Sequence, residues 1–286
     1  MKTHSLQSYA KINICLNVTG KREDGLHELD MIMVPLKMHD SLIVKQIKHP
    51  DNLVTSDDFL VSQGRHNIVT RALEMFLEET KIDKKYRVDI HKVIPVQSGM
   101  GGGSSNAATI LKFLNSVNGN PLSDEQIKDM GEKLGCDVPF FLNCRPARCQ
   151  GTGDIISPIE IKNDYYVLIV KPFKGCSTTE VYEKCDSLTL KTFDIESCIK
   201  ALKEGDDELL AASMGNSLQE PAISIVPEIK CIISLLKDEY KLPIVQMSGS
   251  GSAVFALSTD LKLLKSVLKS LYKRNNCFAE LTKVIK

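Results

Sequence analysis

A glycine-rich segment constrains this chain more than any other feature of its sequence. The segment reads PVQSGMGGGSSNAATIL (residues 95–111) and places four glycines in five positions, at Gly99, Gly101, Gly102 and Gly103. A flexible linker would carry glycine and serine without ordered flanks. Here the strand-like stretch YRVDIHKVIPV precedes the glycines, and apolar residues at helical spacing follow them over residues 107–117. The arrangement predicts that backbone amides at the start of a helix bind an anion such as phosphate.

The chemistry of glycine and serine supports this interpretation, although a purely structural turn is the alternative. Glycine has no Cβ, so a phosphate can approach the backbone closely, and the helix dipole adds about half a positive charge. Ser104 or Ser105 can cap the helix, and Ser105 is the candidate for meeting a phosphate-bound Mg²⁺. No lysine follows the glycines, which excludes a Walker loop, and Ser104 stands where a dinucleotide fingerprint needs its third glycine. Positive charge must therefore come from elsewhere, and Lys11 is the candidate.

Composition limits the classes of partner. The 286 residues suffice for one large or two ordinary domains, and 36 basic residues balance 36 acidic ones. No overall field therefore favours nucleic acid or a membrane surface. Nine cysteines without a C-x-x-C pair indicate reduced thiols, and the start of the chain has no secretory signal pattern, which together predict a cytoplasmic protein. The basic stretch over 261–276 predicts a packed helix, with lipid or partner binding as the alternative.

The first expected strand brings two polar side chains together. Apolar residues at Ile12, Ile14, Leu16 and Val18 alternate with polar ones, which predicts a half-buried strand. Lys11 and Asn13 would then be neighbours on its polar face, about 7 Å apart.

The remaining pattern predicts a mixed α and β protein. A capping box at Ser123 and Gln126 predicts the start of one helix. Pro139 favours an extended backbone at Val138, so CDVPFFL is expected to be strand-like or buried. The pattern changes near residue 155, which predicts domains over 1–155 and 156–286. Helices are expected at 67–80, 107–117, 124–134, 179–186, 195–203, 206–213, 226–239 and 261–276.

The glycine-rich segment resembles the phosphate-binding motif of the GHMP kinases, a family that includes galactokinase, homoserine kinase and mevalonate kinase. The stretches AKINICLNVTGKREDGLHEL and LGCDVPFFL resemble members that phosphorylate a cytidine-diphosphate-linked methylerythritol in isoprenoid precursor synthesis. NSLQEPA, PEI and MSGSGSAVFA resemble the C-terminal half of those members. The resemblance spans nearly the whole chain. It implies an α+β fold with a ribosomal-protein-S5-like N-terminal domain and a ferredoxin-like C-terminal domain, and ATP-dependent phosphorylation of the 2-hydroxyl of that substrate.

The resemblance also implies roles for individual residues. It assigns Asp137 as the catalytic base and Lys11 as its partner, and a carboxylate can indeed accept the hydroxyl proton of the acceptor. ATP and Mg²⁺ are the implied cofactors. The implied nucleotide-binding residues are Asn67, Gly99, Gly101, Gly102, Gly103, Ser104, Ser105 and Asn106, and the implied substrate-binding residues are Asn13, His27, Tyr182, Gly249 and Gly251.

Recognition of the base departs from the family pattern at one position. His27 is implied to hydrogen bond the cytosine, and Tyr182 to stack on one of its faces. The family places Tyr directly before this histidine, whereas this chain has Leu26. A GHMP kinase that acts on a different small alcohol therefore stays open, as does a non-catalytic small-molecule sensor.

Each assignment also has a plainer structural alternative. Asp137 follows an expected helix end and could be a turn residue, and Asn67 could be only a helix cap. His27 could be a surface residue of a hairpin, and a tight turn could explain Gly249 and Gly251. Either a monomer or a homodimer is compatible with the sequence.

Overall fold

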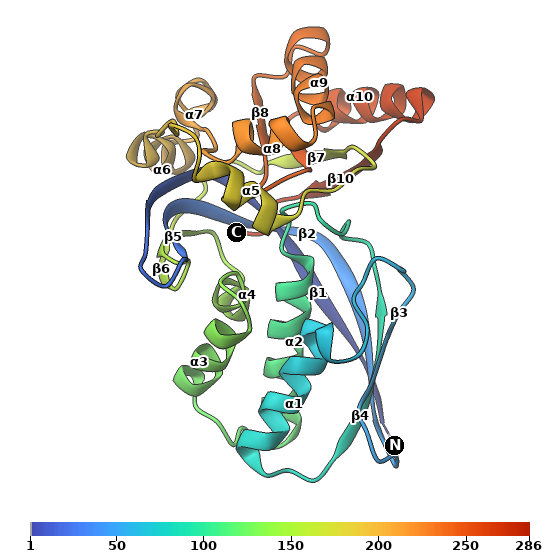
Figure 1. Ribbon diagram of the computed structural model, residues 1–286. Coiled ribbons are helices and arrows are strands. Elements are labelled where there is room, and N and C mark those ends of the chain that lie inside the picture. Colours follow the sequence, from blue (N-terminus) through green and yellow to red (C-terminus); the bar gives the residue numbers. More distant parts are fainter. Residues whose placement is uncertain (1) are drawn as a thin grey trace. The chain divides into compact units, whose positions relative to one another are not determined.

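The computed structural model describes residues 2–286, which form two compact units (Figure 1). Unit 1 contains the chain up to Ala10, Met38–Val96 and Gly101–Cys144. Unit 2 contains Lys11–Lys37, Gln97–Met100 and Arg145–Lys286. Strands β1 (Thr3–Lys21) and β2 (His27–Ile47) contribute residues to both units. The single domain boundary near residue 155 stays a prediction.

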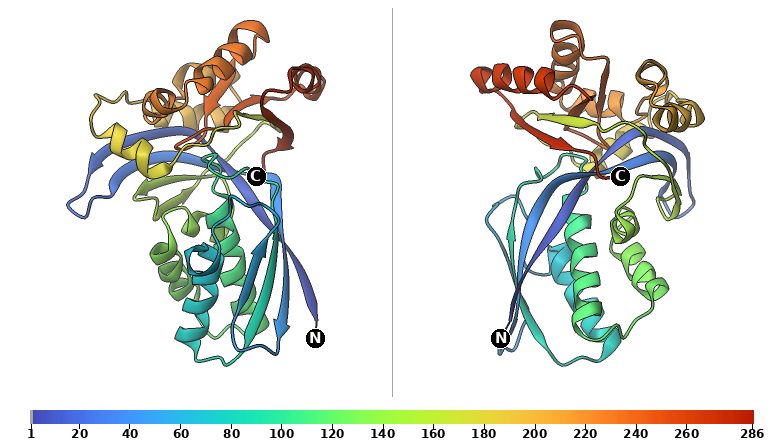
Figure 2. Two further views of the ribbon diagram at one scale, coloured as in Figure 1. Left: turned by 45° about the vertical axis from the view of Figure 1, so that its right-hand side comes forward. Right: turned by 180° about the vertical axis from the view of Figure 1, so that it is seen from behind.

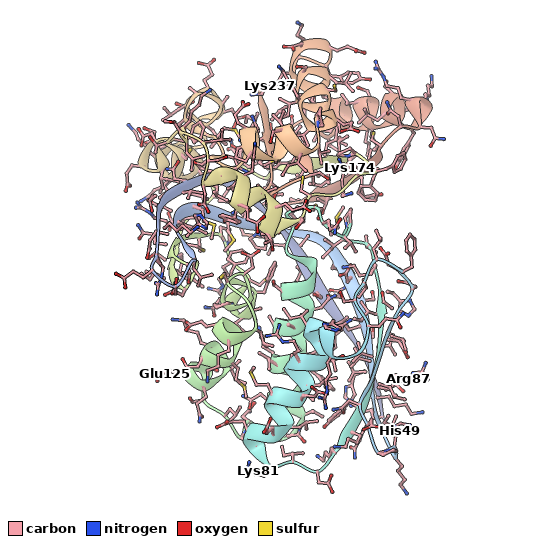
Figure 3. The ribbon with its side chains drawn as sticks, viewed as in Figure 1. His49, Lys81, Arg87, Glu125, Lys174 and Lys237 are labelled. Atoms are coloured by element: carbon pink, nitrogen blue, oxygen red, sulfur yellow. The ribbon has the colours of Figure 1, made fainter. Side chains whose placement is uncertain are left out.

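The sheet of unit 1 follows the alternation that the sequence predicts. Strand β4 (Lys85–His91) pairs antiparallel with the later part of β2 and parallel with β3 (Leu53–Ser56). Val88 and Ile90 of β4 are buried on one face, as predicted, whereas Arg87 lies on the other face, away from the helices (Figure 3). One apolar face therefore remains to be covered.

Helices cover that apolar face of unit 1. Of these, α1 (Ile68–Thr80) and α2 (Gly102–Val117) lie side by side in both Figure 1 and Figure 2. The capping box predicted at Ser123 and Gln126 is present, with both of its hydrogen bonds. The helices of unit 1 are α1 (Ile68–Thr80), α2 (Gly102–Val117), α3 (Asp124–Leu134) and α4 (Val138–Asn143), preceded by the short 3₁₀ turn η1 (Gly64–His66).

The extended conformation predicted at Val138 is wrong. Val138 begins helix α4, and Pro139 lies in its first turn. Proline is tolerated there because the first N–H groups of a helix have no intrahelical acceptor. The prediction of burial is confirmed, since residues 138–141 are buried.

Unit 2 is built around an antiparallel sheet with the strand order β10-β7-β9-β8. The early part of β2 pairs with β5 (Ala147–Gly151), which pairs with β6 (Ile155–Pro158). The four strands of the antiparallel sheet are β7 (Tyr166–Lys171), β8 (Ile244–Met247), β9 (Val254–Ser258) and β10 (Phe278–Lys283).

Most helices of unit 2 start close to where the sequence pattern predicts them, but the helix over Gln219–Ile225 was not predicted. The basic helix α10 buries Leu264, Val267 and Leu271 and leaves its lysines exposed, which confirms the packed interpretation. The helices are α5 (Thr178–Cys185), α6 (Ile195–Glu204), α7 (Asp207–Ser213), α8 (Gln219–Ile225), α9 (Glu228–Ser234) and α10 (Leu261–Arg274), and the short π-helical segment η2 (Leu235–Glu239) follows α9.

The polar face of β1 is buried, so the prediction of a half-buried strand is wrong. Lys11, Asn13, Cys15 and Asn17 are each less than 9% exposed. Segments far along the chain cover this face, as where the side chain of Asn17 exchanges two hydrogen bonds of 2.8 Å with the backbone of Phe193. Alternation shows which residues share a face but not what later covers it.

Two further findings concern the chain as a whole. The nine cysteines all lie within residues 2–286 and form no disulfide there, and five of them are buried. None of the helices over residues 2–286 combines the length and the apolar character that a membrane crossing requires.

Candidate active site

Helix α2 begins directly at the glycine run. Gly101 is its N-cap, with φ 70°, and the first helical hydrogen bond runs from the N–H of Ser105 to the carbonyl of Gly101. Within residues 2–286, the N–H groups of Gly102, Gly103 and Ser104 donate no hydrogen bond. These amides form the kind of anion site that the sequence predicts.

The two serines do not cap the helix, contrary to the prediction. Because Gly101 already occupies the N-cap, Ser104 and Ser105 lie inside the first turn. Ser105 is buried, and its hydroxyl oxygen accepts a 2.8 Å hydrogen bond from Ser8. Asn106 is also buried, and its Oδ1 has no hydrogen-bond partner in the described chain.

The structure requires glycine at some positions of this segment and not at others. A Cβ on Gly99 would lie 2.0 Å from the carbonyl oxygen of Ser248, so Gly99 permits close packing of two backbones. A Cβ on Gly103 would meet only the side chain of Ile68 at 3.6 Å, which is an ordinary contact. Internal packing therefore requires glycine at residue 99 but not at residue 103.

A cation that the sequence analysis missed lies beside the start of α2. A Cβ on Gly102 would come within 2.9 Å of the Nζ of Lys92. Lys92 pairs with Asp40, whose side chain is fully buried and also accepts hydrogen bonds of 2.8 Å from the N–H groups of Val93 and Ile94. No local pattern could have revealed Lys92, because its anchor lies 52 residues away in the sequence.

In unit 2, the predicted neighbours Lys11 and Asn13 are in contact. The Nζ of Lys11 donates to the Oδ1 of Asn13 at 2.5 Å, and the backbone N–H of Lys11 donates to the carbonyl of Met100 at 3.0 Å. The Nδ2 of Asn13 contacts the sulfur of Met31 at 3.2 Å. Strand β1 therefore holds a buried ammonium group beside the segment that leads into α2.

The second glycine-rich loop, Ser248–Ser252, packs against the same residues. A Cβ on Gly249 would lie 2.8 Å from the carbonyl oxygen of Gly99 and 3.2 Å from the Nζ of Lys11. A Cβ on Gly251 would lie 2.8 Å from the sulfur of Met247. Close packing explains both glycines, and their predicted contact with the substrate stays a prediction.

Asn216 holds this loop in place, and the sequence analysis missed it. Its Nδ2 donates to the carbonyl oxygens of Met247 at 3.0 Å and Gly249 at 2.8 Å, and its Oδ1 accepts from the N–H of Leu218 at 2.9 Å. Asn216 is 3% exposed. Asn216 lies in NSLQEPA, one of the stretches that resemble the GHMP kinases, so its motif could have pointed to it. The sequence does not show which groups its side-chain amide contacts.

Two predicted residues of unit 1 lie at helix starts. Asn67 is the N-cap of α1, and its side chain accepts a 2.8 Å hydrogen bond from the N–H of Val69. Asp137 directly precedes α4, is half-buried, and makes no side-chain cap. The adenine contact of Asn67 and the pairing of Asp137 with Lys11 stay predictions.

The residues predicted to recognise the base meet within unit 2. The rings of His27 and Tyr182 lie 4.7 Å apart between centroids and are tilted by 33°. The imidazole is 10% exposed, whereas Leu26 is 47% exposed, and the role of His27 in binding a base stays a prediction. A carboxylate that the sequence analysis missed, Asp186, lies 2.7 Å from the Nε2 of His27.

The available donors suit a magnesium ion that is carried by phosphates. Residues 2–286 contain no group of three or more histidine, cysteine or acidic side chains that could hold a metal by themselves. Mg²⁺ commonly uses only one or two protein oxygens together with substrate phosphates and water. The Ser105 hydroxyl lies in the first turn of α2, and its contact with magnesium stays a prediction.

Two family models match the chain. The model described as "GHMP kinases N terminal domain" matches residues 67–145, and "GHMP kinases C terminal" matches residues 198–276. Among curated proteins, the 4-diphosphocytidyl-2-C-methyl-D-erythritol kinase of Alkaliphilus metalliredigens is 36% identical over 283 residues, which is 96% of each chain. The kinase of the same name from Clostridium acetobutylicum is 34% identical, over 95% of this chain and 97% of its own.

Solved structures agree with these matches. A crystal structure of 4-(cytidine 5'-diphospho)-2C-methyl-D-erythritol kinase superposes with a TM-score of 0.81 at 28% identity, over 99% of this chain and 100% of that one. Homoserine kinase from Cytophaga hutchinsonii has a TM-score of 0.74 at 16% identity, over 100% of this chain and 95% of its own, and shows the fold alone.

The chain therefore belongs to the GHMP kinase family. The predicted two-domain α+β fold of that family and the prediction of a small-molecule kinase are both confirmed. Membership of a kinase family implies the use of ATP.

Proposed function

We propose that this chain transfers the γ-phosphoryl group of ATP to the 2-hydroxyl of 4-diphosphocytidyl-2-C-methyl-D-erythritol, a step of isoprenoid precursor synthesis. The observation that carries the proposal is 36% identity across 96% of both chains to a kinase named for that substrate. Such a match leaves little of the chain outside the alignment in which a different acceptor site could have arisen.

The nucleotide end of the site is assigned to the start of α2. Unpartnered amides of Gly102, Gly103 and Ser104 would donate to phosphate oxygens, and the helix dipole would add to their effect. Lys92, which is held in an ion pair with Asp40 beside these amides, would be a further hydrogen-bond donor to phosphate. Ser105 would supply a hydroxyl oxygen to magnesium. Magnesium would neutralise charge on the phosphates, as in other phosphoryl transfers.

The transferring end is assigned to Asp137 and Lys11. The acceptor oxygen forms a bond to the γ-phosphorus as the bond to the leaving ADP oxygen breaks, and Asp137 receives the hydroxyl proton. Positioning of the hydroxyl against the γ-phosphorus is expected to contribute more than the basicity of the aspartate.

The substrate end is assigned to residues of unit 2. His27 would hydrogen bond the cytosine, Tyr182 would contact one face of the base, and Asn13 would contact the methylerythritol. Gly249 and Gly251 would lie near the substrate phosphates. Stacking of a base on an aromatic ring is worth about 1–3 kcal/mol, so Leu26 in place of the family's tyrosine predicts a several-fold weaker affinity.

One assay tests the function. The wild type is incubated with Mg-ATP and either the cytidine substrate, homoserine or mevalonate, and phosphorylated product is measured. We expect turnover of the cytidine substrate that falls at least about 1000-fold in Asp137→Asn, since removing the base and its charge removes both proton acceptance and positioning. Asp83→Asn is the matched control, because Asp83 is an exposed loop residue of the same unit.

The other outcomes distinguish the alternatives. Turnover of a different alcohol alone would contradict the proposed acceptor, and Leu26 is the observation that favours this alternative. ATP binding without turnover of any alcohol would instead indicate a sensor. Equal activity of Asp137→Asn and wild type would contradict the assignment of the base.

Location and assembly follow the same proposal. We infer a cytoplasmic enzyme that acts as a monomer or homodimer on a small molecule and needs neither nucleic acid nor a membrane. Sedimentation of the purified protein distinguishes the two assemblies.

A further inference from the structure

The aspartate that contacts His27 is not part of the function proposed above. Asp186 is the C-cap residue of α5, four residues after Tyr182. One carboxylate oxygen lies 2.7 Å from the Nε2 of His27, and the other accepts a 2.5 Å hydrogen bond from the Nζ of Lys21. Lys21 at the end of β1 and His27 at the start of β2 are therefore linked through the carboxylate of Asp186 at the end of α5.

Charge determines which way the hydrogen bond to His27 runs. Hydrogen bonds from Lys21 and then from His27 lower the pKa of the Asp186 carboxyl below its ordinary value. An ionised carboxylate can only accept hydrogen bonds, so the Nε2 of His27 must carry the proton. A neutral imidazole has a single N–H, which leaves Nδ1 as an acceptor.

The acceptor nitrogen is available to a ligand. No other hydrogen bond to the imidazole is found across residues 2–286, and one face of the ring is held against Tyr182. Its side chain is 10% exposed, so contact from outside the protein is restricted but not closed. A fixed ring with one open acceptor can discriminate between hydrogen-bonding edges.

We propose that Asp186, held by Lys21, is a positioning residue that fixes the tautomer of His27 so that its Nδ1 selects an amino-bearing base. The proposal rests on the function proposed above. The 4-amino group of cytosine donates a hydrogen bond to Nδ1, whereas the 4-carbonyl of uracil would direct its lone pairs at the lone pair of Nδ1. A site that hydrogen bonds one group strongly rejects an analogue that cannot supply the bond.

The substitution Asp186→Asn should reverse the tautomer. Its amide oxygen would face the donor Lys21, and its NH₂ group would then face the Nε2 of His27. Nε2 would have to accept, so the proton would move to Nδ1, and His27 would become a donor that suits a carbonyl. Asp186→Ala removes the partner and allows both tautomers.

The test combines a spectroscopic readout with two substrates. Nitrogen-15 NMR of the full chain labelled at histidine reports which ring nitrogen of His27 is protonated. Its signals are assigned by comparison with His27→Gln. We expect protonated Nε2 in the wild type and protonated Nδ1 in Asp186→Asn. The kcat/KM ratio of the cytidine substrate to its uridine analogue should exceed about 100 in the wild type, and should fall at least 10-fold in Asp186→Asn and also in Asp186→Ala.

The control variant is Asp164→Asn, which changes another aspartate of the same unit that forms ion pairs with two lysines. It should leave both readouts as in the wild type. Protonated Nδ1 in the wild type, or an unchanged substrate ratio in Asp186→Asn, would overturn this proposal alone. A wild type that turns over neither substrate would overturn the proposed function and, with it, the role assigned to the tautomer.

Discussion

The two glycine-rich loops of this chain look alike in sequence but use glycine for different reasons. In the run that starts α2, residue 103 has room for a Cβ, and the amides of the first turn have no partner within the described chain. In the loop over 248–252, added Cβ atoms would come within 2.8 Å of other atoms at both Gly249 and Gly251. The first run leaves space at Gly103 and unpartnered donors in the first turn of α2, whereas Gly249 and Gly251 of the second loop are packed against protein.

Each glycine of such a motif therefore has to be interpreted from its own surroundings. Gly99 belongs to the phosphate-loop motif, yet its absent side chain makes room for the backbone of Ser248. Substitution to alanine separates the two uses, because alanine adds one methyl group and nothing else.

Gly99→Ala should destabilise the protein most. The positive φ of 72° costs an alanine about 1–2 kcal/mol, and relieving the contact with Ser248 adds about 1–3 kcal/mol. We expect the free energy of unfolding in urea to fall by about 3 kcal/mol. Gly119→Ala is the matched control, since Gly119 has φ 85° but open space around its Cβ. Equal losses in the two variants would mean that the loops do not pack closely.

Asn216→Ala should weaken the second loop specifically. It leaves two buried carbonyl oxygens without their donor, which costs about 1–3 kcal/mol of unfolding free energy. We also expect kcat/KM to fall about 10-fold, because the misplacement of a loop beside Lys11 disturbs positioning. Asn115→Ala, which removes a buried asparagine bonded to both backbone groups of Leu122, should lose similar stability without losing activity. A loss of activity in both variants would contradict a specific role for the loop.

Gly103→Ala should change stability least and in the opposite direction. Alanine is the better helix former by up to about 1 kcal/mol, so unfolding free energy should be unchanged or slightly raised. The KM for ATP should nevertheless rise about 10-fold, because the new methyl group occupies the approach of phosphate to the backbone. Gly20→Ala, where a Cβ would also make only ordinary contacts, should leave KM unchanged. An unchanged KM in Gly103→Ala would remove the phosphate interpretation of the run.

Short-range patterns predicted much of the secondary structure. The capping box at Ser123 uses partners three residues apart, and the burial of Val88 and Ile90 follows from the period of a strand. The same period placed Lys11 beside Asn13, which their hydrogen bond confirms. The predictions at Val138, Ser104 and Ser105 are wrong because local propensity allowed two backbone states and the surrounding structure selected the other.

The candidate site was predicted only in part. Its glycines, Lys11, Asn13 and His27 belong to motifs that can be identified in the sequence. Lys92, Asn216 and Asp186 act through partners 52, 33 and 159 residues away, so no local window contains both members of any of these pairs.

Patterns within short segments were enough to predict most elements, the family and the residues that bear the chemistry, because these depend on spacing along one segment and on motifs that can be identified in the sequence. Three properties could be found only in the folded protein: which glycines have room for a ligand, which segments cover the polar face of β1, and which carboxylates bind Lys92 and His27. These properties depend on distances between segments far apart in the chain, and packing in three dimensions sets those distances.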